Sequence, residues 1–236
     1  MNTTIQKMTN TIQNTKIDEL SLDVIDLVSK YPFESFTIDK IKELISKNTK
    51  TNYATIYRKV DSLVNQGILS KSKYGMASKI NINLGNEQTL SLLAFVEAKK
   101  LEKFLNKLKG NLSISMNEII KDTTPEDKCI IVFGSYAKGN QTKESDLDIF
   151  EIYEPSKYVQ PQNFDYYIDG LKKSIRGMLK TSELRGGPKI NPIIVSSSEH
   201  KEMILNKEVN VAKEVLLNHI ILKGFSEYWR EIAICK

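Results

Sequence analysis

The feature that most constrains the fold is a buried strand followed by a polar loop and two closely spaced aspartates. CIIVF (129–133) is almost wholly apolar and is typical of a strand buried on both faces. A polar loop, GSYAKGNQTKES (134–145), separates it from a second strand, DLDIFEIY (146–153). Because side chains alternate along a strand, Asp146 and Asp148 point to the same face. The chain must therefore place two carboxylates together where the second strand begins.

Two carboxylates that lie this close repel each other unless a cation sits between them. Mg²⁺ suits this position, because it is commonly held by one or two carboxylates together with substrate phosphates. Gly134 permits a tight turn after the first strand, and Ser135 supplies a hydroxyl where a short helix can begin. Backbone N–H groups at a helix start favour phosphate oxygens. We therefore expect the loop to bind the phosphates of a nucleotide and the aspartates to bind the metal.

The remainder of the second half alternates between strand and helix patterns. INPIIVS (190–196) indicates a third strand, and the segments 163–181 and 199–222 indicate helices. A tail that contains Trp229 follows Gly224. This alternation predicts an α/β arrangement with a small sheet.

The first half shows three helical patterns and then a hairpin pattern. Apolar residues recur at helical spacing from Ile17 until Pro32 stops the first helix. A second helix follows a Thr37 cap, and a third covers about 52–66. Alternating residues within 68–84 then indicate two strands around a turn. Three helices followed by a hairpin is the order of a winged helix-turn-helix domain.

Positive charge is concentrated in the first half. Residues 1–110 hold 17 Lys and Arg against 11 Asp and Glu, whereas residues 111–236 hold 17 against 18. Such an excess favours an anionic partner, with double-stranded DNA as the first candidate. The expected DNA contacts lie on the third helix and the hairpin: Asn52, Tyr53, Thr55, Tyr57, Arg58, Lys59, Lys71 and Lys73. A protein-interaction module of the same fold remains the alternative.

The order Gly134-Ser135-x-Ala137-x-Gly139-x5-Ser145-Asp146-x-Asp148 resembles the signature of the DNA polymerase beta-like nucleotidyltransferase superfamily, and most of all its small prokaryotic members. The resemblance covers about 128–196. It implies a nucleotidyltransferase fold, Mg²⁺ and a nucleoside triphosphate, with ATP the first candidate. The implied nucleotide-binding residues are Gly134, Ser135, Lys138 and Ser145, and the implied catalytic metal ligands are Asp146 and Asp148.

Together these patterns predict an α+β chain in four parts. The expected parts are a frayed N-terminus (1–16), a winged helix-turn-helix domain (17–86), a connecting helix (87–110) and a nucleotidyltransferase-like domain with a small mixed sheet and a C-terminal helix (111–236). The connecting helix can equally form a dimer seam, and a homodimer is a natural expectation for a winged helix that binds DNA.

One position departs from the family pattern. The family usually carries a third acidic residue on a later strand, but the matching strand here has Asn191 and Pro192, and the acidic neighbours are Glu183 and Glu199. An amide cannot act as a base and is a poorer metal ligand than a carboxylate. Two functions therefore stay open. One is transfer of a nucleoside monophosphate to a hydroxyl of a protein, a nucleic acid end or a small molecule. The other is DNA-binding regulation with nucleotide bound but not turned over.

Composition bears on where the protein works. No apolar run approaches the roughly 18 residues of a membrane span. The first residues are polar and do not resemble a secretory signal. Two cysteines, Cys129 and Cys235, do not form a disulfide framework. We therefore expect a cytoplasmic protein without a membrane partner.

Overall fold

The computed structural model describes residues 17–47, 50–75, 77–121, 126–157, 160, 163–184 and 187–236. The segment predicted to be frayed, 1–16, lies outside the described residues. The chain divides into two compact units between Val96 and Glu97, and residues 232–234 and 236 are grouped with the first unit. Among the helices that the structure describes, none combines the length and apolar character that a membrane crossing needs. The mixed α+β class predicted from the sequence is confirmed.

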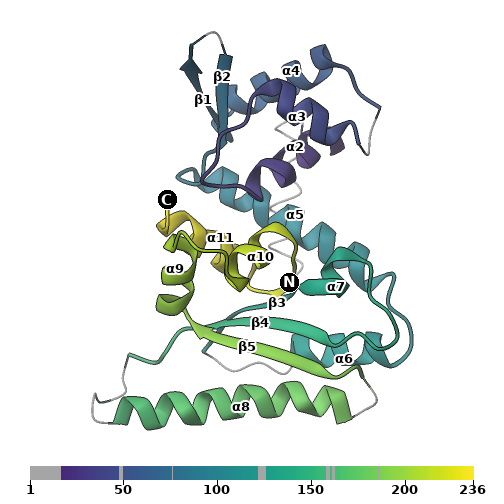
Figure 1. Ribbon diagram of the computed structural model, residues 1–236, viewed down its shortest axis with the longest axis vertical. Coiled ribbons are helices and arrows are strands. Elements are labelled where there is room, and N and C mark those ends of the chain that lie inside the picture. The colour runs from purple at the N-terminus through teal and green to yellow at the C-terminus, as the bar shows by residue number, and fades with distance from the viewer. Residues whose placement is uncertain are drawn as a thin grey trace. The chain divides into compact units, whose positions relative to one another are not determined.

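Between Ile17 and Leu84, the described residues of the first unit form three helices and an antiparallel hairpin (Figure 1). The elements are α2 (Glu19–Ser29), α3 (Ile38–Ile45), α4 (Tyr53–Asn65), β1 (Leu69–Tyr74) and β2 (Ala77–Ile82). Each helix begins at a polar cap, because the side chains of Asp18, Thr37 and Asn52 accept a backbone N–H of the first turn. Phe36 also exchanges two backbone hydrogen bonds of 2.8 Å with Ile80 of β2. The segment between α2 and α3 therefore pairs with β2 at one residue, on the side of β2 that does not face β1.

Helix α5 (Glu87–Leu105) carries the chain from the first unit to the second, and α6 (Asn111–Lys121) follows it. The sequence predicted the start of α5 correctly and placed its end several residues too late. The last bonds show why: Lys107 and Leu108 donate to carbonyls only three residues back, so the helix tightens and ends before Gly110.

The second unit is built on a four-stranded mixed sheet in the order β5-β4-β3-β6. The strands are β3 (Asp127–Val132), β4 (Leu147–Tyr153), β5 (Ile190–Ser196) and β6 (Ile220–Lys223). Strands β4 and β5 are parallel and are joined through α8 (Phe164–Leu184), whereas β3 is antiparallel to both of its neighbours.

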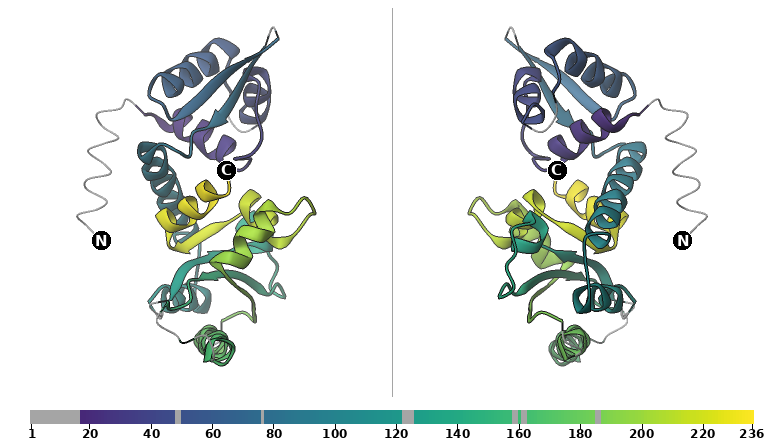
Figure 2. Two further views of the ribbon diagram at one scale, coloured as in Figure 1. Left: turned by 90° about the vertical axis from the view of Figure 1, so that its left-hand side faces the viewer. Right: turned by 90° about the vertical axis from the view of Figure 1, so that its right-hand side faces the viewer.

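Helices cover both faces of this sheet, as Figures 1 and 2 show. Helices α6 and α8 lie on one face, where Leu171 and Ile175 of α8 pack with Val132 and Ile149 of the sheet. On the other face lie α9 (Ser197–Leu205), α10 (Val211–Leu217) and α11 (Phe225–Ile234). The sheet is thus the middle of three layers, and side chains from both of its faces are buried.

The prediction of one long helix over 199–222 is wrong. The structure has two shorter helices, α9 and α10, followed by the strand β6, and the Trp-containing tail forms the helix α11. Asn210 lies at the break, where its side chain caps α10 by accepting the Lys213 N–H and donates to Met203 O of α9 at 2.7 Å. The apolar run after His219 pairs with β3 instead of continuing a helix.

Candidate functional site

The site lies where β3 ends and β4 begins. Phe133, the residue after β3, is the N-cap of the short helix α7 (Gly134–Lys138), and its N–H donates to Asp148 O at 3.1 Å. Antiparallel pairing of Val132 with Ile149 holds the two strands in this register. The Gly-Ser turn and the aspartate segment, which are separate in the sequence, are therefore neighbours in space.

Gly134 has no room for a side chain. Its φ of 66° lies in the left-handed region. A methyl group at this position would lie 2.2 Å from Asp148 Oδ2, which is far inside van der Waals contact. The carboxylate of Asp148 thus lies directly against the backbone of the turn, and any side chain at position 134 would have to displace that carboxylate.

Strand β5 flanks the two aspartates on their other side. Asn191 is the register partner of Asp148, and its Nδ2 donates to Asp148 Oδ1 at 3.0 Å. Lys189, just before β5, donates from Nζ to Asp146 Oδ2 at 2.9 Å. The hydrogen bond to Asp146, together with its negative charge, raises the pKa of the Lys189 ammonium. Each aspartate therefore has one hydrogen-bond donor supplied by the β5 segment.

Lys189 was missed by the sequence reasoning, although a signal for it exists. It lies two residues before Asn191, so the alternation of a strand places both side chains on the side that faces the aspartates. An acid was expected on this strand, whereas the side chains that it brings to the aspartates are an ammonium and an amide.

The remaining loop residues have partners of their own. Ser145 Oγ accepts the Thr142 N–H at 2.9 Å, which closes the turn before Asp146. Lys138 Nζ donates to Glu214 Oε1 of α10 at 2.7 Å. Ser145 is therefore a support of the loop, and Lys138 is held by a carboxylate in this structure.

The donor set fits a hard cation completed by phosphate oxygens. Within the described residues, no group of three or more His, Cys, Asp or Glu side chains is placed to hold a metal ion. The two flanking glutamates have structural roles: Glu183 Oε2 accepts the Ile190 N–H at 3.4 Å, and Glu199 forms the capping box of α9. Asp146 and Asp148, each with one donor from the β5 segment, are the residues that would hold Mg²⁺, because this ion is commonly bound through one or two carboxylates together with substrate phosphates.

The residues predicted to contact DNA separate into two groups. Tyr53 and Tyr57 are exposed on α4, with ring centroids 6.3 Å apart, and Lys71 Nζ lies 5.4 Å from the centroid of the Tyr57 ring. Arg58 and Lys73 are also exposed. Exposed aromatic and basic side chains therefore lie together on α4 and on β1, the strand that follows it.

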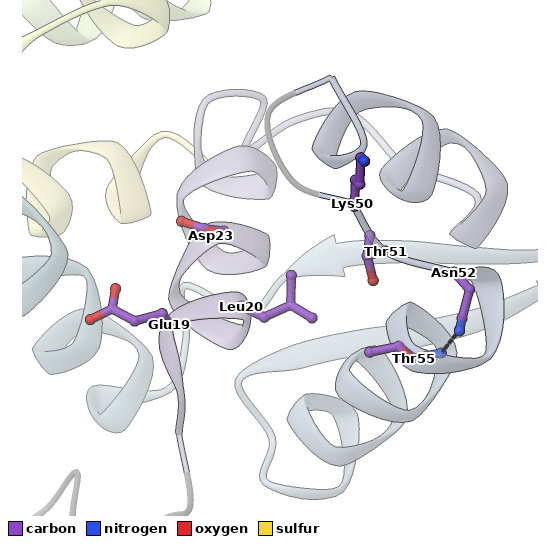
Figure 3. Close-up of a pocket in the computed structure, with 7 residues that line it drawn as sticks. All are labelled: Glu19, Leu20, Asp23, Lys50, Thr51, Asn52 and Thr55. Carbon is purple, nitrogen blue, oxygen red and sulfur yellow. Dashed lines mark hydrogen bonds between the residues drawn. The ribbon is translucent and has the colours of Figure 1, made fainter.

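The other predicted contacts are engaged elsewhere. Lys59 forms an ion pair with Asp18, the cap of α2. Asn52 and Thr55 are joined by the cap hydrogen bond of 2.9 Å and line a cavity of about 760 Å³ beside the start of α2 (Figure 3). Glu19, Asp23 and Lys50 also line it, so its charged side chains are two acids and one base.

Comparison with known proteins finds a family whose match covers the segment from Gly134 to Asn191. The family described as "Nucleotidyltransferase domain" matches residues 114–217, which lie within the second unit. A protein of Methanocaldococcus jannaschii that is provisionally named a protein adenylyltransferase is 33% identical over 114 residues, covering 48% of this chain and 83% of that protein. No solved structure matches the chain. The family match includes Gly134, both aspartates and Asn191.

Proposed function

The chain belongs to the nucleotidyltransferase-domain family, and we propose that its second unit is a Mg²⁺-dependent enzyme that transfers an adenylyl group from ATP to a hydroxyl of a protein. The observation that carries this proposal is the contact between the Asp148 carboxylate and the Gly134 turn, with Asp146 two residues away. The name of the archaeal relative supports the choice of ATP and of a protein acceptor.

In the proposed reaction, the acceptor oxygen forms a bond to the α-phosphorus of ATP. The bond between that phosphorus and the oxygen bridging to the β-phosphate breaks, pyrophosphate leaves, and the hydroxyl proton passes to solvent. Mg²⁺ held by Asp146 and Asp148 would offset the negative charge that develops on the transferring group.

The chain's own residues would bind and orient the triphosphate. Gly134 lets phosphate oxygens approach the backbone, and the Ser135 hydroxyl is a donor at the same turn. Ser145 holds the loop that leads to Asp146. Lys138 can reach a phosphate only after it leaves Glu214, so we assign it an auxiliary role.

The proposal is tested by substituting one aspartate and measuring pyrophosphate release and protein labelling. With ATP, Mg²⁺ and an acceptor protein, Asp148→Ala is expected to lower the rate by about 100-fold or more, because it removes half of the carboxylate pair. Asp165→Ala removes an exposed carboxylate from α8 and should leave the rate unchanged. Equal rates in wild type and Asp148→Ala would contradict the proposal.

A nucleotide sensor without turnover is the alternative for the second unit. Asn191, in register with Asp148, supplies no base and no third carboxylate. ATP binding that depends on Asp148, with no pyrophosphate released in the presence of any acceptor tested, would favour this alternative.

For the first unit we propose a winged helix-turn-helix that binds double-stranded DNA. The order of three helices and a hairpin, and the Phe36–Ile80 pairing, support this fold. The exposed aromatic and basic residues of α4 and β1 support the choice of partner. A protein-binding role of the same unit is the alternative.

DNA binding is tested with a duplex of mixed sequence over a range of salt concentrations. Arg58→Ala should weaken binding several-fold and reduce the salt dependence, because a phosphate or base contact is lost. Lys30→Ala, at the end of α2, is the control for a lost positive charge. Absence of any binding at low salt would end the DNA proposal.

A further inference from the structure

The β5 segment presents an ammonium and an amide to the two aspartates, where a metal-binding strand would present acids. Lys189 Nζ lies 2.9 Å from Asp146 Oδ2, and Asn191 Nδ2 lies 3.0 Å from Asp148 Oδ1. The second oxygen of Asp148 faces Gly134. Thus the ammonium of Lys189 already offsets part of the negative charge of the two aspartates, and the amide of Asn191 occupies one of their oxygens.

A free divalent cation at this position would meet two obstacles. It competes with Lys189 for the carboxylate of Asp146, whose Oδ2 accepts the lysine, and it is repelled by the ammonium as long as that group stays near. Asn191 adds no negative charge to compensate. Strongly hydrated cations such as Mg²⁺ also give up water reluctantly, so two partly occupied carboxylates attract them only weakly.

A triphosphate removes both obstacles. Its oxygens supply the missing ligands and the missing negative charge for the cation. They also offer Lys189 a new partner, since an ammonium binds phosphate as a point charge. The Lys189 side chain is 71% exposed, so it can turn from Asp146 toward a bound phosphate without disturbing packed residues.

We propose that Lys189 and Asn191 exclude a free divalent cation from the aspartate pair, so that the cation enters only as its complex with a nucleoside triphosphate, whose phosphates then bind Lys189. This inference rests on the proposed nucleotidyl-transfer site. It adds that the cation and the triphosphate enter together, and that Lys189 binds a phosphate. It makes Lys189 both a barrier to the bare cation and a binding group for the nucleotide complex.

The test uses the full chain and two probes, Mn²⁺ alone and Mn²⁺ with a non-hydrolysable ATP analogue. Electron paramagnetic resonance measures free Mn²⁺, and calorimetry measures binding of the complex. Lys189→Met should raise the affinity for Mn²⁺ alone by about tenfold or more, and it should weaken binding of the complex several-fold. Asn191→Asp should raise the affinity for Mn²⁺ alone, because it adds a carboxylate.

In Lys189→Met, a higher affinity for Mn²⁺ alone together with a lower affinity for the complex distinguishes the proposed role from a merely structural one. Lys173→Met, on the exposed side of α8, removes the same charge from the same unit and should change neither affinity. If Lys189→Met and Asn191→Asp bind Mn²⁺ no better than wild type, while wild type binds the complex, the inference is overturned and the proposed function stands. If wild type does not bind the complex, both are overturned.

Discussion

At the scale of single residues, Gly134 shows how one position determines the site. Its left-handed backbone and its contact with Asp148 Oδ2 are independent reasons for glycine. Gly139 ends α7 with a similar φ of 73°, but an added methyl group there meets nothing within 4 Å. Alanine substitutions at the two positions therefore share the backbone strain, but only the one at Gly134 also collides with the aspartate.

We predict that Gly134→Ala abolishes nucleotide binding, because the methyl group displaces Asp148. It should also lower stability by about 2–3 kcal/mol, through left-handed strain and the collision. Gly139→Ala should cost only about 1 kcal/mol and keep nucleotide binding. Calorimetric titration with the ATP analogue and urea unfolding measure the two effects. Similar behaviour of the two variants would show that contact with Asp148 is unimportant.

Glu151 is a second residue whose surroundings allow a sharp prediction. It is 1% exposed on β4, and burial, followed by the hydrogen bond to Asp127 and its charge, raises the pKa of Glu151 to about 9. The folded state therefore holds a proton that the unfolded chain releases above pH 4.5. The contribution of Glu151 to the free energy of unfolding is therefore fully present below pH 4.5 and is lost as the pH rises toward 9.

Glu151→Gln keeps the shape and a hydrogen-bond donor but cannot ionise. We expect it to stabilise the protein by on the order of 2 kcal/mol at pH 8, and by much less at pH 5. Urea unfolding at both pH values measures this difference. A variant that is less stable than wild type at pH 8 would mean that Glu151 is ionised in the fold.

His200 gives the opposite dependence on pH. It is fully buried between the rings of Phe150 and Tyr228, and its two ring nitrogens have no hydrogen-bond partner within the described part of the chain. Burial, and next the positive charge of Lys128, lowers the pKa of His200 to about 4. Stability contributed by the neutral ring is present above pH 6.5 and is lost as the pH falls toward 4.

We predict that His200→Phe reduces the loss of stability on acidification. Relative to wild type, the variant should gain up to about 2 kcal/mol at pH 5 compared with pH 7.5. Thermal unfolding across this range provides the measurement. Parallel pH profiles for the two proteins would contradict the assignment of a neutral, buried imidazole.

At the scale of elements, the sequence was informative wherever local chemistry decides the structure. Polar caps mark the start of α2, α3 and α4, and the apolar runs of β3, β4 and β5 were placed within two residues. Strand β6 was missed, because Ile220, Ile221 and Leu222 are compatible with a helix by local pattern. Only pairing with β3, more than 80 positions earlier, decides their conformation.

The break between α9 and α10 can be tested at Asn210. Asn210→Ala removes the cap of α10 and the bond to Met203 O, so we expect a loss of about 1–2 kcal/mol. Asn210→Asp keeps the capping oxygen but not the donor, and it should recover part of the loss. Urea unfolding ranks the three proteins. Equal stabilities would show that the break does not depend on this side chain.

At the scale of the whole molecule, the candidate site combines a part that the sequence shows and a part that only the fold supplies. The motif from Gly134 to Asp148 is local, so it could be found by spacing alone. The partners are Lys189, just before β5, Asn191 of β5 and Glu214 of α10, and their contacts depend on sheet order and helix packing. Periodicity within one segment carries no information about such contacts.

The two units also differ in how far the sequence could be interpreted. The second unit has a motif in which Gly134 lies against Asp148, and its family is established. The first unit offers charge and element order, which indicate a class of partner but no specific contact. Its DNA contacts therefore stay predictions for the binding experiment.

The central claim, nucleotidyl transfer at the aspartate pair, is tested most directly by the fate of the two ends of ATP. Parallel reactions use ATP radiolabelled at the α-phosphate or at the γ-phosphate, with wild type and Asp148→Asn. The account predicts that the α-label becomes bound to protein, that the γ-label is released as pyrophosphate, and that both events disappear in the variant. Protein-bound γ-label, or α-label incorporation that survives Asp148→Asn, would contradict it.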